Sequence, residues 1–70
     1  MVKSGEIYKH YKGNTYGVIT TAKHCDTDEI YVVYKNLETS EVYIRNIKDF
    51  EGESHNCKRF VLIDEVEIRV

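Results

Sequence analysis

Tyrosine is the unusual residue of this sequence, and its placement beside basic residues predicts a binding surface. Six of the 70 residues are Tyr, against two Phe and no Trp. Tyr8, Tyr11 and Tyr16 crowd one short stretch, together with His10 and Lys12. A tyrosine ring offers a stacking surface and a hydroxyl that can donate or accept a hydrogen bond. Beside Lys and His, such rings suit a flat heterocycle that carries phosphate, or a single-stranded base.

The later tyrosines also lie near charged residues. Tyr34 precedes a lysine, and Tyr43 is two residues from Arg45. In the acidic stretch that ends at Glu29, a carboxylate could accept hydrogen bonds from ribose hydroxyls, as acidic residues do in dinucleotide sites. A solvated loop is the commoner interpretation of such a stretch. Half-buried strand positions likewise account for single tyrosines, because β-strands favour them.

Catalysis is not indicated by the histidines. His10 and His24 could act as general bases, but a catalytic His needs an orienting partner and a nucleophile or substrate within reach. The sequence shows no such trio. We therefore expect no catalytic residues and no enzyme, with a small hydrolase that uses His10 or His24 as the least favoured hypothesis.

The two cysteines predict neither a disulfide framework nor a metal centre. Cys25 and Cys57 are the only cysteines, which is too few for a disulfide scaffold. Each has a histidine nearby, His24 and His55, but adjacent residues on an extended strand point to opposite faces and reach one ion poorly. We expect free thiols in a reducing compartment, no metal and no cofactor.

The elements that must position these residues are short strands separated by turns. Lys12-Gly13-Asn14 predicts a tight hairpin turn, since these residues tolerate positive φ. Gly17 suggests a bulge, a bend or a close backbone approach. Residues 47–51 are too few for a stable free helix and predict a single helical turn that packs Phe50 against the barrel end. The predicted strands cover residues 6–11, 15–21, 29–35, 41–45 and 59–63, with a possible sixth at 66–70.

This arrangement predicts one all-β domain over residues 1–70, a small SH3-like barrel of five to six short antiparallel strands with one short helical turn. Residues 64–70 could form an extra edge strand or an oligomerisation strand. Strand 41–45 alternates, with Val42 and Ile44 on one face and Tyr43 and Arg45 on the other, and either face could point inward. The expected core residues are Ile7, Val18, Ile30, Val32, Tyr34, Val42, Ile44, Phe60 and Leu62.

Charge and hydropathy exclude several classes of protein. Residues 1–25 carry four lysines and one acidic residue, whereas residues 26–70 carry six basic and eleven acidic residues. Long DNA is therefore not an expected partner, because bulk phosphate binding needs many cations on one surface. No apolar stretch reaches the length that spans a membrane, and no leader opens the chain. We expect the cytoplasm, which would be the host cytoplasm for a viral protein.

An ordered set of motifs resembles a known family. Gly5-x-x-Tyr8-x-His10-Tyr11-Lys12-Gly13-x-x-Tyr16-x-Val18, then Ala22-Lys23-His24, Thr27-x-Glu29 and Val32-Val33-Tyr34, is similar to the bacterial and phage family catalogued as domain of unknown function 1653. The resemblance covers roughly residues 5–63 and includes Tyr43-x-Arg45 and Arg59-Phe60. Cys25 departs from it, since the family tends to have a small hydroxyl residue there.

The resemblance implies a small β fold with a polar, aromatic binding surface. We expect a non-enzymatic protein that binds a nucleotide-like small molecule, and a phage-encoded member could sequester a host nucleotide immune signal. A domain this small encloses little, so a pocket between the subunits of a homo-oligomer would bury a ligand better. The alternative is a protein- or RNA-interaction module of SH3-like type. The expected ligand-binding residues are Tyr8, His10, Tyr11, Lys12, Tyr16, His24, Glu29, Tyr34 and Arg45.

Overall fold

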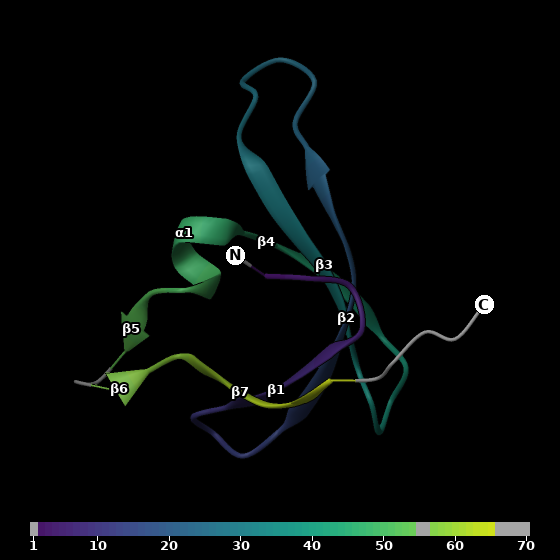
Figure 1. The fold of residues 1–70 in the computed structure, drawn as a ribbon, viewed down its shortest axis with the longest axis vertical. Helices are drawn as coiled ribbons and strands as arrows, with labels where there is room; N and C mark the ends of the chain where they lie inside the picture. Colours follow the sequence, from purple (N-terminus) through teal and green to yellow (C-terminus); the bar gives the residue numbers. More distant parts are fainter. Residues whose placement is uncertain (1, 55–56, 66–70) are drawn as a thin grey trace.

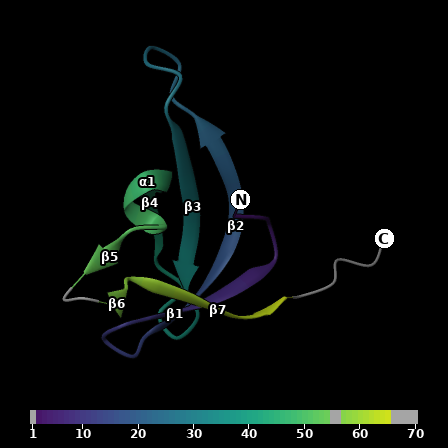
Figure 2. The same ribbon diagram turned by 60° about the vertical axis from the view of Figure 1, so that its left-hand side comes forward.

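The computed structural model describes residues 2–54 and 57–65. Its elements are β1 (Glu6–His10), β2 (Thr15–Lys23), β3 (Ile30–Asn36), β4 (Val42–Asn46), α1 (Ile47–Phe50), β5 (Glu53–Ser54), β6 (Cys57–Lys58) and β7 (Phe60–Glu65). Five strands form one antiparallel sheet in the order β4-β3-β2-β1-β7, and β5 pairs with β6 (Figures 1 and 2). The prediction of an all-β domain with one short helical turn is confirmed.

The sheet is not closed into a barrel, which differs from the closed architecture that the sequence predicted. Closure would require β4 to pair with β7, and these strands form the two edges of the sheet instead. Between them the chain forms α1 and the small β5–β6 sheet (Figure 1). Side chains span the gap, because the guanidinium carbon of Arg45 on β4 lies 5.7 Å from the ring centre of Phe60 on β7.

The β2–β3 hairpin is longer than the rest of the sheet. Its register runs from Tyr16 opposite Asn36 to Lys23 opposite Ile30, with a bulge between Val18 and Thr20. The connecting loop, residues 24–29, projects well beyond the other strands (Figures 1 and 2). The length of this hairpin therefore separates its tip from the sheet's other end, where β1 turns into β2.

The core is small, and three of the six buried hydrophobic residues in the described part of the chain are aromatic. Its buried residues pack on the face of the sheet that we call the inner face, and the short helix α1 adds Phe50 to them at 1% exposure. The prediction that Phe50 packs as part of a helical turn is confirmed. The buried hydrophobic residues are Val2, Val18, Val32, Tyr34, Phe50 and Phe60.

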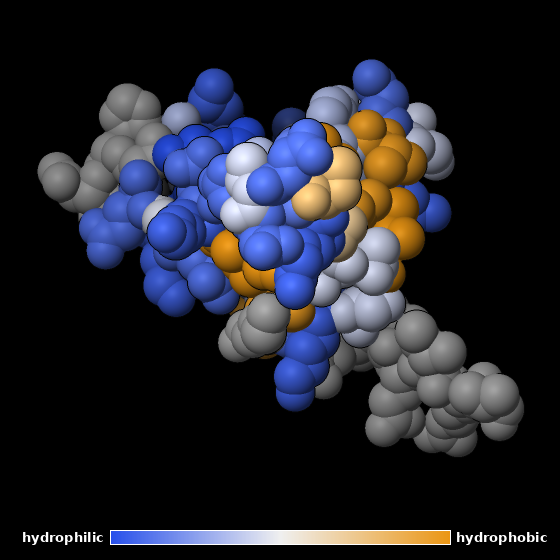
Figure 3. Space-filling model, turned by 90° about the horizontal axis from the view of Figure 1, so that it is seen from above, coloured by the Kyte–Doolittle hydropathy of each residue, from blue (hydrophilic) through white to orange (hydrophobic). Residues whose placement is uncertain are grey.

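Three of the expected core residues are exposed instead. Val42 and Ile44 are 57% and 67% exposed, and Leu62 is 45% exposed. In β4 the inner face is taken by Tyr43 and Arg45, because the register places Tyr43 opposite buried Tyr34. Figure 3 shows apolar residues in orange along one side of the molecule. Ile7 and Ile30, also expected in the core, are half-buried.

Candidate ligand-binding surface

Five aromatic rings meet on the inner face, one from each strand of the sheet. The register places Tyr34 opposite Tyr43 and His10 opposite Phe60. The ring centre of Tyr16 lies 5.3 Å from that of Tyr34 and 5.8 Å from that of Phe60. Edge-to-face contacts of this kind are favourable for aromatic pairs. We call these rings and the basic residues around them the aromatic–cationic cluster: His10, Lys12, Tyr16, Tyr34, Tyr43, Arg45, Arg59 and Phe60.

Two arginines provide positive charge at these rings. Arg45 Nε donates to the Tyr34 hydroxyl over 3.3 Å. Arg59 directly precedes Phe60, and within the described part of the chain its Nε is buried without a hydrogen-bond partner. A buried donor left unpaired costs free energy.

His10 lies among the cations of the cluster as a neutral donor. Its Nδ1 accepts a hydrogen bond from the Lys12 amide over 3.2 Å. Burial lowers the pKa of His10, and the charges of Arg45, Lys12 and Arg59 lower this pKa further. A neutral imidazole whose Nδ1 is an acceptor carries its proton on Nε2. The cluster thus combines three fixed cations with an uncharged ring donor, which favours an anionic ligand.

Ring surface remains available at the margin of the cluster. Tyr43 is 38% exposed and the neighbouring Tyr11 is 36% exposed, whereas Tyr34 and Phe60 are buried. The Lys12 ammonium lies 5.9 Å from the ring centre of Tyr11, and the rings of His10 and Tyr11 are 4.5 Å apart. Exposed rings next to cations can stack on a base while the cations neutralise its phosphate.

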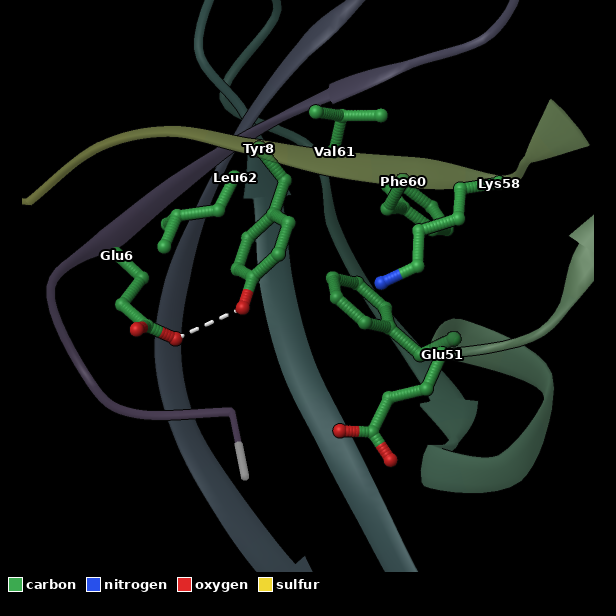
Figure 4. A pocket seen from close by; sticks show the side chains of 8 residues that line it. Glu6, Tyr8, Glu51, Lys58, Phe60, Val61 and Leu62 are labelled. Atoms are coloured by element: carbon green, nitrogen blue, oxygen red, sulfur yellow. Dashed lines mark hydrogen bonds between the residues drawn. The ribbon is translucent and has the colours of Figure 1, made fainter.

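A cavity of about 580 Å³ adjoins the cluster through Phe60 (Figure 4). Phe50 and Phe60 stack in its wall with centres 4.1 Å apart. At one end the Tyr8 hydroxyl donates to Oε1 of buried Glu6 over 2.8 Å, and Lys58 lies toward the other end with Glu51. Two carboxylates against one ammonium make this cavity a poor site for phosphate.

The loop at the hairpin tip holds His24 apart from the cluster. His24 Nδ1 accepts from the amides of Asp26 and Thr27 over 3.2 and 3.4 Å, so this ring stabilises its own turn. The turn also brings the metal-ligating atoms of His24, Cys25 and Asp26 within 4.8 Å of one another, all on exposed side chains. The sequence argument that adjacent side chains diverge applies to a strand, whereas these residues lie in a turn.

Glu29 fastens the hairpin to the start of α1. Its Oε2 accepts from the side-chain amide of Asn46 over 2.7 Å. Asn46 also caps α1, since its Oδ1 accepts from the Lys48 amide over 2.9 Å. This hydrogen bond gives Glu29 a role in holding the fold together, and its place in the loop between β2 and β3 keeps it apart from the cluster.

The structure thus divides the nine expected ligand-binding residues among four places. Tyr8 lines the cavity, His24 and Glu29 lie at the hairpin loop, and Tyr11 lies beside the cluster. The cluster itself contains His10, Lys12, Tyr16, Tyr34 and Arg45. Sequence reasoning left Tyr43, Arg59 and Phe60 out of the site, although the alternation of Tyr43-x-Arg45 already placed those two residues on one face.

Comparisons with known proteins assign a family without a function. The family model described as "Protein of unknown function (DUF1653)" matches residues 6–62. No curated protein and no solved structure matches the chain. In the part of the chain that the structure describes, no helix has the length and apolar character needed to cross a membrane.

Proposed function

The chain belongs to the DUF1653 family of proteins of unknown function, and for this member we propose the non-enzymatic binding of a nucleotide-like small molecule. The aromatic–cationic cluster is the site. The observation that carries the proposal is the convergence of Arg45, Lys12 and Arg59 around His10, whose pKa is lowered first by burial and then by these three charges. A phosphate would neutralise these cations, and a flat base would stack on exposed Tyr43 or Tyr11.

Binding is favoured over catalysis by the way in which His10 is held. Its Nδ1 accepts a hydrogen bond from the backbone amide of Lys12 in the adjacent turn. A general base instead needs a group that orients it toward a substrate proton. The cations around it stabilise an anion without any covalent step. The narrower function, the sequestration of a host nucleotide immune signal by a phage protein, stays a prediction.

The test is a nucleotide panel measured by thermal shift and calorimetry. Mono-, di- and cyclic nucleotides are expected to raise the melting temperature, while the matching nucleosides and inorganic phosphate alone have smaller effects. Arg45→Gln should weaken nucleotide binding about tenfold or more, because a charge-assisted contact is lost. Lys9→Gln is the matched control, since Lys9 is exposed on the opposite face of β1.

Two results would overturn the proposal. The first is a panel in which no nucleotide stabilises the protein. The second is an Arg45→Gln variant that binds like the wild type while circular dichroism shows it folded. Binding of a single-stranded RNA with a steep salt dependence, in place of mononucleotides, would favour the interaction-module alternative.

A further inference from the structure

We propose that β4 is an assembly edge at which two copies of this chain pair antiparallel about a two-fold axis next to Tyr43. The pairing would join two inner faces side by side. The second copy would thereby add its own Tyr43 and Arg45 to a ligand site, a consequence that rests on the proposed function. The pairing itself rests on the backbone and side chains of β4.

The outer edge of β4 has no strand beside it in the described residues. β4 pairs with β3 alone, and it is the terminal strand of the sheet. Asn36 donates to the carbonyl of Glu41 across the β3–β4 ladder over 2.9 Å. Because hydrogen-bonded pairs alternate along an antiparallel ladder, Val42 and Ile44 direct their backbone groups toward the free edge. An unpaired edge of this kind is a template for another strand.

The usual protection of an edge strand is weak in β4. Natural edges carry lysine, proline or a bulge that discourages pairing. The sequence from Val42 to Asn46 contains no lysine and no proline, and its ladder with β3 has an unbroken register. Its one charge, Arg45, points to the inner face, where it bonds to the Tyr34 hydroxyl.

The side chains of β4 complement themselves about a two-fold axis at Tyr43. This register places Val42 opposite Ile44 of the second copy, and these two residues are 57% and 67% exposed. It also places Glu41 opposite Arg45 of the second copy on the inner face, so that opposite charges face each other twice. Opposite-charge and apolar pairs directly across two strands stabilise a sheet.

Glu41 is already positioned on the face where this pairing needs it. Partial burial, the charge of Glu41 and a hydrogen bond with its carboxylate raise the pKa of Tyr43. This hydrogen bond places the Glu41 carboxylate at the Tyr43 hydroxyl, on the side of the strand that carries Arg45. In the paired form, the two Tyr43 rings meet at the axis between two Glu41–Arg45 pairs.

Disulfide trapping tests the register directly, in a chain with Cys25→Ser and Cys57→Ser. Tyr43→Cys should give a covalent dimer on mild oxidation, because residues opposite each other in a non-hydrogen-bonded pair have Cα atoms about 4.5 Å apart, within disulfide reach. Ile44→Cys is the matched control, since residue 44 faces residue 42 of the other copy. Faster dimer formation by Ile44→Cys than by Tyr43→Cys would overturn this register.

Sedimentation velocity over a range of concentrations tests the assembly without a cross-link. We expect a dimer that dissociates on dilution, because five residues of pairing bury less than a standard interface. Val42→Lys should weaken it about tenfold through the loss of two apolar cross-strand pairs. Val61→Lys, at a residue 49% exposed on β7, should leave it unchanged. A monomer at every concentration, or species larger than a dimer, would overturn the proposal.

The two proposals fail separately. A protein that binds nucleotides as a monomer would contradict only the pairing of β4. A dimer with the expected register that binds no nucleotide would contradict only the proposed function.

Discussion

At the scale of residues, His10 is the side chain whose state reports most directly on the cluster. Its ring contacts Phe60 at 4.9 Å between centres and Tyr16 at 6.3 Å. Burial and three cations favour its neutral form. The cost of protonating it in the folded protein makes the cluster sensitive to mild acid and to any anion that binds there.

The pH dependence of stability should show this cost. The pKa of His10 lies below its ordinary value in the folded protein, so the unfolded chain binds the proton first as the pH falls. The contribution of His10 to the free energy of unfolding is therefore at its maximum above about pH 6.5. It declines as the pH falls from there through the pKa of His10 in the folded protein. Urea unfolding at several pH values should show a smaller decline in His10→Gln.

A bound nucleotide should raise the pKa of His10 back toward its ordinary value. Phosphate next to Arg45 and Lys12 offsets their charges, so the pKa of His10 should rise on binding when followed by the ring protons in NMR. An unchanged His10 titration in the presence of a saturating nucleotide would place the ligand elsewhere on the molecule.

At the scale of elements, α1 depends on what lies at its two ends. It has only four residues, from Ile47 to Phe50, and a free helix of this length is unstable. The cap from Asn46 holds its start, and burial of Phe50 holds its end. The same Asn46 side chain binds Glu29, so it connects α1 to the β2–β3 hairpin.

Replacement of Asn46 tests this connection. Asn46→Ala should lower the free energy of unfolding by about 1 kcal/mol, the typical value of a helix cap. Asn46→Asp keeps a capping oxygen but places a second carboxylate at Glu29, so it should separate the two roles. Equal unfolding free energies for wild type and Asn46→Ala in urea titrations would show that the cap contributes nothing.

The sequence predicted the elements better than the faces of those elements. The five strands of the main sheet, the turn at Gly13 (φ 103°) and the helical turn with Phe50 appear where turn residues and alternation placed them. The short strands β5 and β6 were not predicted, and the possible strand at 66–70 lies outside the described residues. Alternation could not decide which face of 41–45 points inward, because both faces carry large apolar or aromatic groups. The aromatic side chains fill the inner face, and Val42 and Ile44 remain outside.

The sequence predicted only the part of the site whose residues are close together in the chain. Tyr16, His10 and Lys12 are close in sequence, so one hairpin brings them together. Phe60 joins them only through the β1–β7 register, which the sequence does not specify. His24 lies far from the cluster because it follows the end of β2, whose nine residues make a longer strand than alternation alone predicted. At Gly17 a Cβ would lie 3.1 Å from a side-chain carbon of Leu37, so a side chain, and not another backbone segment, lies close to this glycine.

At the scale of the whole molecule, a few rings provide most of the buried apolar volume. Phe50 and Phe60 stack at 4.1 Å, and Tyr34 contacts both of them. A domain of about this length buries only about 60% of the surface that its unfolded chain exposes. Each of these rings therefore contributes a large share of a small total stability.

Truncation of Phe50 should show how small that total is. Phe50→Ala should cost about 3–5 kcal/mol, the usual range for a buried phenylalanine, and so leave much of the protein unfolded at 25 °C. Ile63→Ala, at a residue 53% exposed on β7, is the control and should cost little. Circular dichroism during thermal unfolding measures both, and similar melting temperatures would contradict a core built on Phe50.

The gap between the edge strands β4 and β7, which we call the seam, allows the sheet to open locally. Backbone ladders hold every neighbouring pair of strands in the sheet, but Arg45 and Phe60 meet across the seam through side chains alone. The two edges can move apart without breaking a backbone hydrogen bond, so amide protons there should exchange with solvent through local opening. Those of Val18 and Val32, in strands paired on both sides, should exchange only on global unfolding. A ligand that contacts both β4 and β7 would hold the two edges together. It should therefore slow the exchange of amide protons in these two strands before that of any others.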